Sequence, residues 1–391
     1  MVSPQQQPPA LYQDREQTAV KHKVLEHYLY LLAVIVGRRF SSITYIDGFS
    51  GPWEARDPEL KDTSFGIALE QLRKAKSYLA GQQINIALRC FFIEADATAY
   101  QRLKQFADSI TDAVVKTKNC EFEAAIPAIQ EFVREGGKDT FPFVFIDPKG
   151  WTGFAMKTIE PLLKLEPGEV LVNFMTNHIS RFVHAPEELR HEEFQELFGS
   201  DEYKRISREL PAQDREDQLV RLYMEKLRKA GNFKHVCAAM VLRPQMDLTN
   251  FHLIYATRHH KGVSVFKEAE RKAMEFQEQT RADAKQQKRQ SHDRQGELFG
   301  AQVLHKNGHY DELRERYLLA ARTAVEAQLG RAKRLAYEQA WETALSYPLV
   351  WEKDLRSWIK EWEHEKRLRV DGLKDRAKTP TYGDRHWLVT L

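Results

Sequence analysis

Short apolar runs and longer amphipathic stretches alternate along the first half of the chain. The runs lie at 43–46, 84–93, 113–118, 141–146 and 168–174, and stretches of helical periodicity lie at 14–37, 63–79, 98–106 and 124–133. Runs of this length without a polar face are typical of buried strands, and the intervening period is that of amphipathic helices. Because strands and helices alternate, we predict an α/β fold built on a doubly wound, mainly parallel sheet.

The pattern changes after the fifth strand. Residues 185–230 form a charged, helical insertion, and two further apolar runs at 236–242 and 251–257 are separated only by a short turn around 244–247. So short a connection predicts an antiparallel pair. A Rossmann dinucleotide fold would continue with another crossover helix, whereas the sheet of Rossmann-like class I methyltransferases ends in an antiparallel hairpin.

The rest of the chain predicts the domain boundaries. We expect a disordered start over 1–13, an α/β domain over 14–265, a helical linker over 266–309, and a small unit over 310–391. In that unit an amphipathic helix over 352–363 precedes two short strands at 368–370 and 387–391. The loop between these strands carries Lys374, Arg376 and Lys378. Helices followed by a hairpin with a basic tip resemble a winged-helix module, which can lie along a phosphate backbone or bind only protein.

Composition sets broad limits on function. A chain of 391 residues is long enough for two domains, and the net charge of +3 favours neither nucleic acid nor any other partner. No apolar run reaches the length of about 18 residues that a membrane span needs. The three cysteines have no metal-ligand spacing, so we expect buried thiols, no metal site, and a soluble, cytoplasmic protein.

Acidic residues follow three of the predicted strands directly. Asp47 ends the first strand, Glu94 the second and Asp147 the fourth. In open α/β sheets ligands bind beyond the carboxyl ends of the strands. Gly48 and Gly51 let the backbone approach a ligand closely. We therefore expect a small-molecule cleft at this edge, although each acid can also simply cap its own turn.

Individual positions along this edge suit particular chemical groups. One carboxylate, Glu94, can accept hydrogen bonds from both hydroxyls of a ribose. An amide at Asn119, beside Cys120, can hold an adenine ring. Pro148 stiffens the turn after the fourth strand, and Trp151 offers a rim on which a planar substrate can stack, unless its ring is simply packed.

These motifs resemble those of a known family. The acid-turn-glycine element after the first strand resembles motif I of class I S-adenosylmethionine (AdoMet) methyltransferases. Residues 20 to roughly 270 resemble the three-Cys-motif partner (TcmP) family of methyltransferase-like proteins, and the tail is similar to the winged-helix domain that often follows. The matching residues are Lys21-His22, Tyr45-Ile46-Asp47 with Phe49 and Gly51, Phe92-Ile93-Glu94, Phe145-Ile146-Asp147-Pro148 with Gly150, and Arg181.

The resemblance implies AdoMet as the cofactor. The methionine moiety would lie on the turn formed by Asp47, Gly48, Phe49, Ser50 and Gly51. The ribose would lie on Glu94 with Ala95, and the adenine between Asn119 and Cys120. Lys21 or His22 would close the pocket. A protein partner would be a neighbouring protein that carries the three-cysteine motif, which this chain lacks.

The resemblance also implies a catalytic position. Family members are distantly similar to ribosomal RNA adenine-N6 methyltransferases, whose motif is Asp-Pro-Pro-Tyr. Here the catalytic stretch is Asp147, Pro148 and Lys149. In an amino methyltransferase the carboxylate and the adjacent backbone carbonyl accept hydrogen bonds from the target amino group, which frees its lone pair for attack. Substrate contacts would come from Trp151, Arg181, Lys374, Arg376 and Lys378.

Three functions follow as hypotheses. The first is an AdoMet-dependent methyltransferase that acts on the amino group of a nucleic-acid base, with the winged helix helping to dock the substrate. The second is a catalytically degenerate, regulatory binding protein that works with a protein partner, which Lys149 and Trp53 favour because both depart from the usual motifs. The third is methylation of a protein or small molecule.

Overall fold

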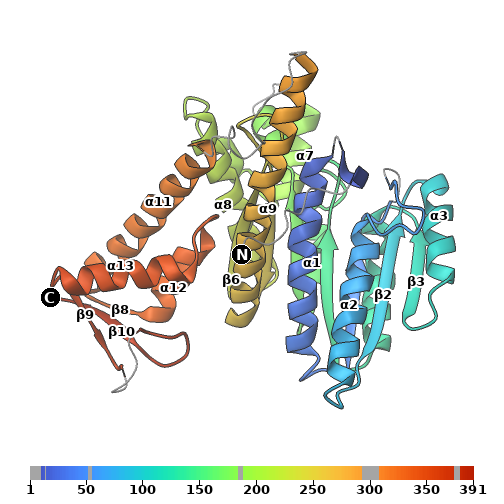
Figure 1. Cartoon of the computed structure of the whole chain (residues 1–391), viewed down its shortest axis with the longest axis horizontal. Coiled ribbons are helices and arrows are strands. Elements are labelled where there is room, and N and C mark those ends of the chain that lie inside the picture. The colour runs from blue at the N-terminus through green and yellow to red at the C-terminus, as the bar shows by residue number, and fades with distance from the viewer. Residues whose placement is uncertain (1–9, 14, 52–54, 184–187, 293–307, 374–378) are drawn as a thin grey trace.

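The computed structural model describes residues 10–13, 15–51, 55–183, 188–292, 308–373 and 379–391. A seven-stranded sheet organises most of it, in the order β3-β2-β1-β4-β5-β7-β6 (Figure 1). All neighbours pair in parallel except β7, which is antiparallel to both β5 and β6. The strands are β1 (Ser42–Asp47), β2 (Ala87–Glu94), β3 (Val114–Asn119), β4 (Thr140–Ile146), β5 (Glu169–Phe174), β6 (His235–Leu242) and β7 (Thr249–Thr257).

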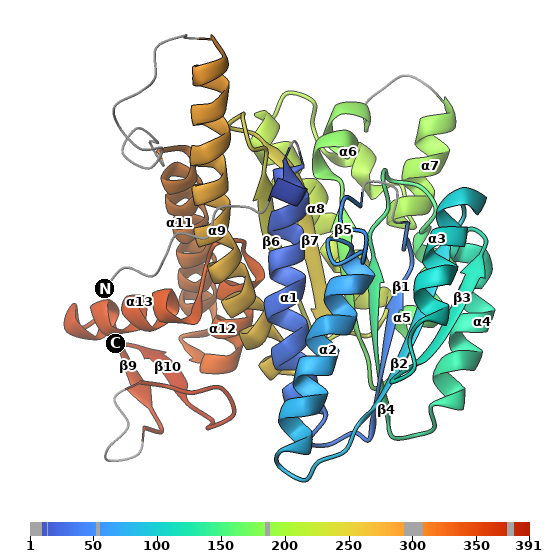
Figure 2. The same cartoon turned by 45° about the vertical axis from the view of Figure 1, so that its right-hand side comes forward.

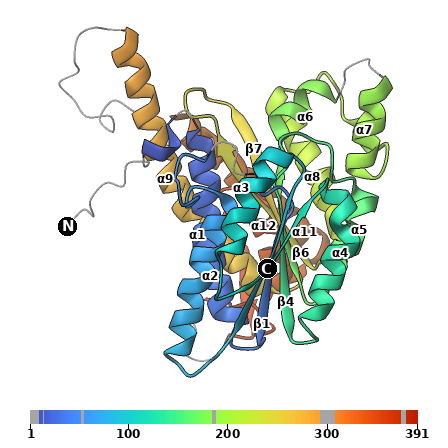
Figure 3. The same cartoon turned by 90° about the vertical axis from the view of Figure 1, so that its right-hand side faces the viewer.

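Helices cover both faces of this sheet (Figures 2 and 3). One face packs against α1 (Glu16–Val36), α2 (Ser64–Ala80), α3 (Ala97–Asp108) and α9 (His260–His292). The other packs against α4 (Phe122–Glu135), α5 (Met156–Leu163), α6 (Thr176–Phe182), α7 (Glu188–Phe198) and α8 (Ala212–Ala230). Strand residues alternate between these two cores, since Tyr45 contributes to the first and Ile46 to the second.

The fold class predicted from the sequence is confirmed. All seven strands and the antiparallel terminal hairpin lie where the apolar runs placed them, and this strand order is that of the class I methyltransferase fold. The short helix α5 was not predicted, because it is only two turns long and contains Pro161. Within the structure's described ranges, no helix is long and apolar enough to cross a membrane.

Helical elements lie within or across two of the predicted boundaries. The expected disordered start, 1–13, includes a 3-10 helix, η1 (Ala10–Tyr12), and the Tyr12 ring is buried. The expected linker, 266–309, begins inside α9, whose Phe266, Ala273 and Met274 are buried against the first face of the sheet. The apolar stripe of α9 is hard to recognise in the sequence because charged residues of its outer face lie between the apolar positions. Residues 1–9 and 293–307 lie outside the described residues.

The C-terminal unit contains a second, three-stranded antiparallel sheet in the order β8-β10-β9. Its elements are α11 (Gly308–Ala332), β8 (Arg334–Ala336), α12 (Tyr337–Ser346), α13 (Glu352–His364), β9 (Leu368–Asp371) and β10 (Trp387–Thr390). The predicted amphipathic helix and hairpin are confirmed as α13 and β9–β10, whereas β8 was not predicted. Lys374, Arg376 and Lys378 lie outside the described residues.

Buried polar contacts hold the C-terminal unit on α9. Lys267 Nζ donates to Glu270 Oε2 at 2.8 Å and to the Tyr347 carbonyl at 2.7 Å, and Glu270 Oε1 accepts the Leu349 N–H at 2.9 Å. Both charged side chains are at most 3% exposed. Arg316 of α11 adds ion pairs of 2.6 Å to two aspartates of α8. The apolar core is continuous across this junction, so the two units form one packed body.

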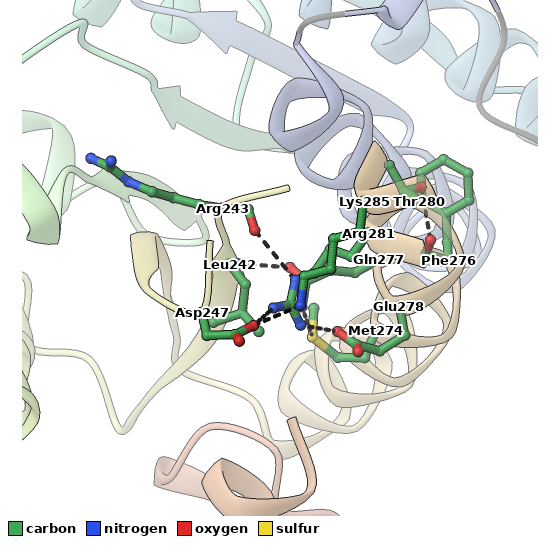
Figure 4. Close-up of polar contacts among 10 residues, drawn as sticks. All are labelled: Leu242, Arg243, Asp247, Met274, Phe276, Gln277, Glu278, Thr280, Arg281 and Lys285. Carbon is green, nitrogen blue, oxygen red and sulfur yellow. Dashed lines mark hydrogen bonds and ion pairs between the residues drawn. The ribbon is translucent and has the colours of Figure 1, made fainter. Parts of the chain in front are cut away.

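Arg281 of α9 anchors the β6–β7 turn (Figure 4). Its side chain is 2% exposed, forms ion pairs with Asp247 and Glu278, and donates to the Arg243 carbonyl at 3.3 Å. Lys285 adds a second contact to Asp247 at 2.9 Å. The side chain of Arg243 extends away from this cluster. The turn is therefore fixed by α9 while Arg243 is left to face the other way.

We expect Arg281→Met to lower the free energy of unfolding by about 2–3 kcal/mol, because it removes a buried guanidinium from two carboxylates and a carbonyl. Chemical denaturation measures this change. Arg271→Met is the matched control on the same helix, since Arg271 is 35% exposed and its ion-pair partners among the described residues are Glu268 and Glu275. Its loss should stay within about 1 kcal/mol. Equal losses in the two variants would contradict a structural role for Arg281.

Candidate functional site

The three predicted acids lie together at one edge of the large sheet. Glu94, Asp47 and Asp147 end or directly follow β2, β1 and β4, which are adjacent and parallel. The chain runs outward from β1 through β2 to β3 and then in the other direction from β4 to β5, so the strand order reverses between β1 and β4. Ligands of open α/β sheets bind at such a reversal, and Asp47 and Asp147 flank it.

Asp47 is fully buried and hydrogen-bonded within the protein. Its Oδ2 accepts from Ser64 Oγ at 2.6 Å and from Tyr45 OH at 3.1 Å, and its Oδ1 accepts the Phe49 N–H at 3.2 Å. Burial, together with the negative charge of Asp147, raises the pKa of Asp47 to about 6, although the Ser64 hydrogen bond opposes the rise. The protein therefore holds an energetically costly carboxylate at the reversal of the sheet.

The turn after Asp47 is fixed by backbone contacts to both neighbouring strands. The Gly48 N–H donates to the Phe145 carbonyl at 2.9 Å, and the Ser50 N–H donates to the Ile93 carbonyl at 2.7 Å. A Cβ at Gly48 would lie 2.8 Å from the Phe122 ring. Close packing against α4 thus requires glycine there. The turn continues through Gly51 into 52–54, which include Trp53 and lie outside the described residues.

Glu94 ends β2 as the sequence predicted. Its Oε1 accepts the Asp96 N–H at 2.7 Å, burial raises its pKa, and the charge of Lys149 opposes that rise. Asn119, at the end of β3, donates to the carbonyls of Glu94 at 2.8 Å and Ala95 at 3.0 Å. Asn119 thus braces the Glu94 turn with its NH2 group, and its carbonyl oxygen is left for other contacts. Cys120, beside it, is half-buried with a free thiol.

Asp147 is held between α1 and β5. Its Oδ2 accepts from Lys21 Nζ at 2.5 Å, and its Oδ1 accepts from Asn173 Nδ2 at 2.7 Å. The side chains of Lys21 and Asp147 are each 13% exposed, so the ion pair is largely withdrawn from water. The structure thus brings the predicted Lys21 to the predicted acid from 126 residues away.

Asn173 is a site residue that the sequence analysis missed. It lies at the end of β5 and is 3% exposed, and its Oδ1 has no hydrogen-bond partner among the described residues. Asn177 of α6 likewise has an unpartnered, buried Nδ2. Buried polar atoms are rarely left unpaired in proteins. One signal was present in the sequence, since a polar residue near the end of a buried, otherwise apolar strand is unusual, but no motif marked it.

His22 faces inward from α1 beside Lys21. Its Nδ1 lies 2.9 Å from Tyr12 OH, and the two rings pack edge to face at 5.6 Å. Burial lowers the pKa of His22 well below its usual value, and the charges of Lys21 and Arg15 lower it further. The imidazole is therefore neutral at physiological pH. Of the two residues expected to close the pocket, Lys21 contacts the Asp147 carboxylate and His22 packs behind it.

Trp151 lies in an aromatic cluster and does not stand free at a rim. Its ring stacks on Phe194 at 5.5 Å and packs on Phe182 at 5.4 Å, and its Nε1 donates to Glu193 at 2.8 Å. The ring thus joins the turn after β4 to α6 and α7.

Two arginines carry positive charge to this side of the site. Arg181, in the last turn of α6, is exposed. Burial lowers the pKa of His178, and the charges of Arg181 and Arg243 lower it further. Arg243 was missed because a single arginine in a loop has no sequence signature. No group of three or more metal-ligating side chains occurs within the described ranges.

Comparisons with known proteins add little beyond the fold. The sequence matches no family model and no curated protein. A solved structure from Legionella pneumophila strain Philadelphia 1, of domain family DUF519, has 13% sequence identity to this chain. The match covers 62% of this chain and 85% of that one, with a TM-score of 0.36. A second solved structure, a candidate methyltransferase from Thermobifida fusca, has 12% sequence identity to this chain. The match covers 64% of this chain and 83% of that one, with a TM-score of 0.32.

A loganic acid methyltransferase with S-adenosylhomocysteine is also similar, at 6% identity over 73% of this chain and 93% of that one, with a TM-score of 0.30. Likenesses this remote do not indicate an activity for this chain. The fold assignment therefore rests on the strand order and the antiparallel hairpin described above.

Proposed function

We propose that this protein is an AdoMet-dependent methyltransferase that acts on the amino group of a nucleic-acid base. One observation carries the proposal: Asp47, Glu94 and Asp147 lie side by side at the carboxyl edge of a sheet with the class I methyltransferase order. The resemblance of the chain to TcmP proteins supports the same assignment. The TcmP assignment and the winged-helix interpretation of the C-terminal unit belong to this proposal.

The residues at the edge fit the polar groups of AdoMet. Glu94 has a second carboxylate oxygen beyond the one that the Asp96 N–H occupies, and a ribose diol needs such an acceptor. The turn from Gly48 to Gly51 is held at both strand ends and would take the methionine moiety. Asn119 keeps its Oδ1 for the adenine amino group. When bound, AdoMet would supply an electrophilic methyl group on its sulfonium.

The Asp147 site fits an amino substrate. A carboxylate has about four lone-pair positions, and Lys21 and Asn173 use two of those on Asp147. The remaining positions, together with the unpartnered Asn173 Oδ1, can accept the two N–H bonds of a target amine. Such contacts orient the nitrogen lone pair away from the carboxylate and stabilise the positive charge that develops on the nitrogen during attack. The ion pair with Lys21 holds the carboxylate in place.

Calorimetric titration with AdoMet and, separately, with S-adenosylhomocysteine tests the cofactor site. We expect micromolar binding, about −8 kcal/mol, that is lost in Asp47→Asn and in Glu94→Gln. Both changes preserve size while removing a carboxylate. Asp108→Asn is the matched control, because Asp108 is an exposed acid at the far end of α3 whose ion-pair partner, in the part of the chain that the structure describes, is Lys104.

The outcomes separate the hypotheses. Binding that Asp108→Asn preserves and the other two variants abolish would support the cofactor assignment, and transfer of labelled methyl groups to total RNA or DNA would then test the substrate class. If folded protein binds neither ligand, the methyltransferase proposal is wrong. The degenerate-fold alternative, with a protein partner, would take its place.

A further inference from the structure

A separate cavity lies between the large sheet and the C-terminal unit. Its volume is about 770 Å³, and its walls come from α8, β6, α11, α12 and the residues just after α12. Figure 1 shows α12 and α11 beside β6 and α8, so the cavity lies along the edge of the sheet where β6 is the last strand. None of the acids of the AdoMet site lines it. A volume of this size falls within the range of small-molecule sites.

The cavity contains buried polar groups that have no partner. His235 of β6 is 6% exposed and Trp341 of α12 is 1% exposed, and both line the cavity. Neither ring nitrogen of His235, nor Nε1 of Trp341, has a hydrogen-bond partner in the part of the chain that the structure describes. The nearest acidic atom to His235, Glu342 Oε1, is 3.6 Å away. Burial lowers the pKa of His235 to about 4, so it presents one neutral donor and one acceptor.

The charges around the cavity are unbalanced in favour of cations. Its carboxylates are already engaged: Asp217 pairs with Arg316 at 2.6 Å, Glu225 with Lys229 at 2.5 Å, and Glu342 accepts from Tyr382 OH at 2.8 Å. The exposed residues Arg221, Arg228 and Arg331 also line it. None of these three arginines has a carboxylate partner among the described side chains; Arg221 lies over the Tyr347 ring at 4.9 Å.

We propose that this cavity binds a phosphorylated nucleotide, either free or as part of a single strand. Arginines at an open rim suit phosphate, whose oxygens accept their charge-assisted hydrogen bonds. The neutral imidazole and indole N–H deeper in the cavity suit the polar edge of a base, and Tyr347 offers a ring face for stacking. The proposal does not rest on methyl transfer, because the cavity and the AdoMet site share no residue.

Fluorescence polarisation on the full-length protein tests the proposal with two probes, a fluorescent ATP analogue and a short fluorescein-labelled single-stranded RNA. At least one probe should bind, and which one binds distinguishes a free nucleotide from a strand. The double variant Arg228→Gln/Arg331→Gln should weaken that binding at least about tenfold and reduce the slope of log affinity against log salt. His235→Phe should weaken binding about tenfold while leaving the salt slope unchanged.

Controls keep this test independent of the AdoMet site. Lys226→Gln removes a charge on α8 that does not line the cavity and whose partner, Glu202, does not line it either, so this variant should bind the probe as the wild type does. Asp47→Asn should also bind it normally, even though we expect that variant to lose AdoMet. The proposal fails if neither probe binds the folded protein, or if the double arginine variant binds as tightly as Lys226→Gln.

Discussion

Replacing Asp147 with asparagine should reduce methyl transfer at least about 100-fold while leaving AdoMet affinity within about threefold of the wild type. The amide keeps the size of the side chain but supplies only one acceptor oxygen, and its NH2 group would face one of the two donors, Lys21 or Asn173. The target amine would then be poorly oriented. Transfer of labelled methyl groups to total RNA or DNA, alongside calorimetry, separates turnover from cofactor binding.

Two further variants sharpen this test. Asn173→Ala removes the unpartnered Oδ1 and one donor to Asp147, so we expect it to lower turnover with little change in AdoMet affinity. Asp139→Asn is the matched control, because Asp139 lies just before the opposite end of the same strand and its carboxylate accepts, among the described residues, only the Ser41 N–H at 2.9 Å. Full turnover in Asp147→Asn would remove Asp147 from the catalytic position.

The sequence predicted the parts of the site that depend on strand ends. A run such as 43–46 is typical of a buried strand, which puts the acid after it at the carboxyl edge of the sheet, and the same reasoning placed Glu94 and Asp147. The doubly wound sheet and its antiparallel terminal pair then followed from the alternation of strand and helix and from the short turn before β7. These inferences need only local periodicity and general rules of connection.

The contacts that complete the site depend on the folded geometry. Asn173 reaches Asp147 only because β5 pairs beside β4, and Ser64 reaches Asp47 only because α2 begins above β1. Neither residue belongs to a motif, and each becomes recognisable only through its partner. The cavity beside β6 could not be predicted from the sequence either. Its walls come from segments separated by about a hundred residues, and it forms only because the C-terminal unit packs on α9.

The buried carboxylate of Asp47 should make the protein less stable as pH rises from about 4 to about 7. Its pKa of about 6 in the folded protein exceeds the ordinary aspartate value of 3.8, so the folded state binds more protons than the unfolded state within that window. Stability attributable to Asp47 is therefore highest below pH 4, falls as pH rises through the window, and is constant above it. A shift of roughly two pKa units corresponds to about 3 kcal/mol.

Asp47→Asn removes this titration. Its free energy of unfolding, measured by denaturation at pH 4 and pH 7, should rise relative to the wild type by about 3 kcal/mol between the two values. Any change in hydrogen bonding adds a constant that cancels in the comparison.

Ser64→Ala provides the opposite result: the Ser64 hydroxyl stabilises the charged carboxylate, so its loss should steepen the wild-type decline of stability with pH. If the wild type and Asp47→Asn instead show the same dependence of stability on pH, the charged form of Asp47 does not destabilise the fold. The predicted curves would instead mean that the fold tolerates a destabilising charge at the reversal of its sheet, as expected of a carboxylate retained for binding and not for stability.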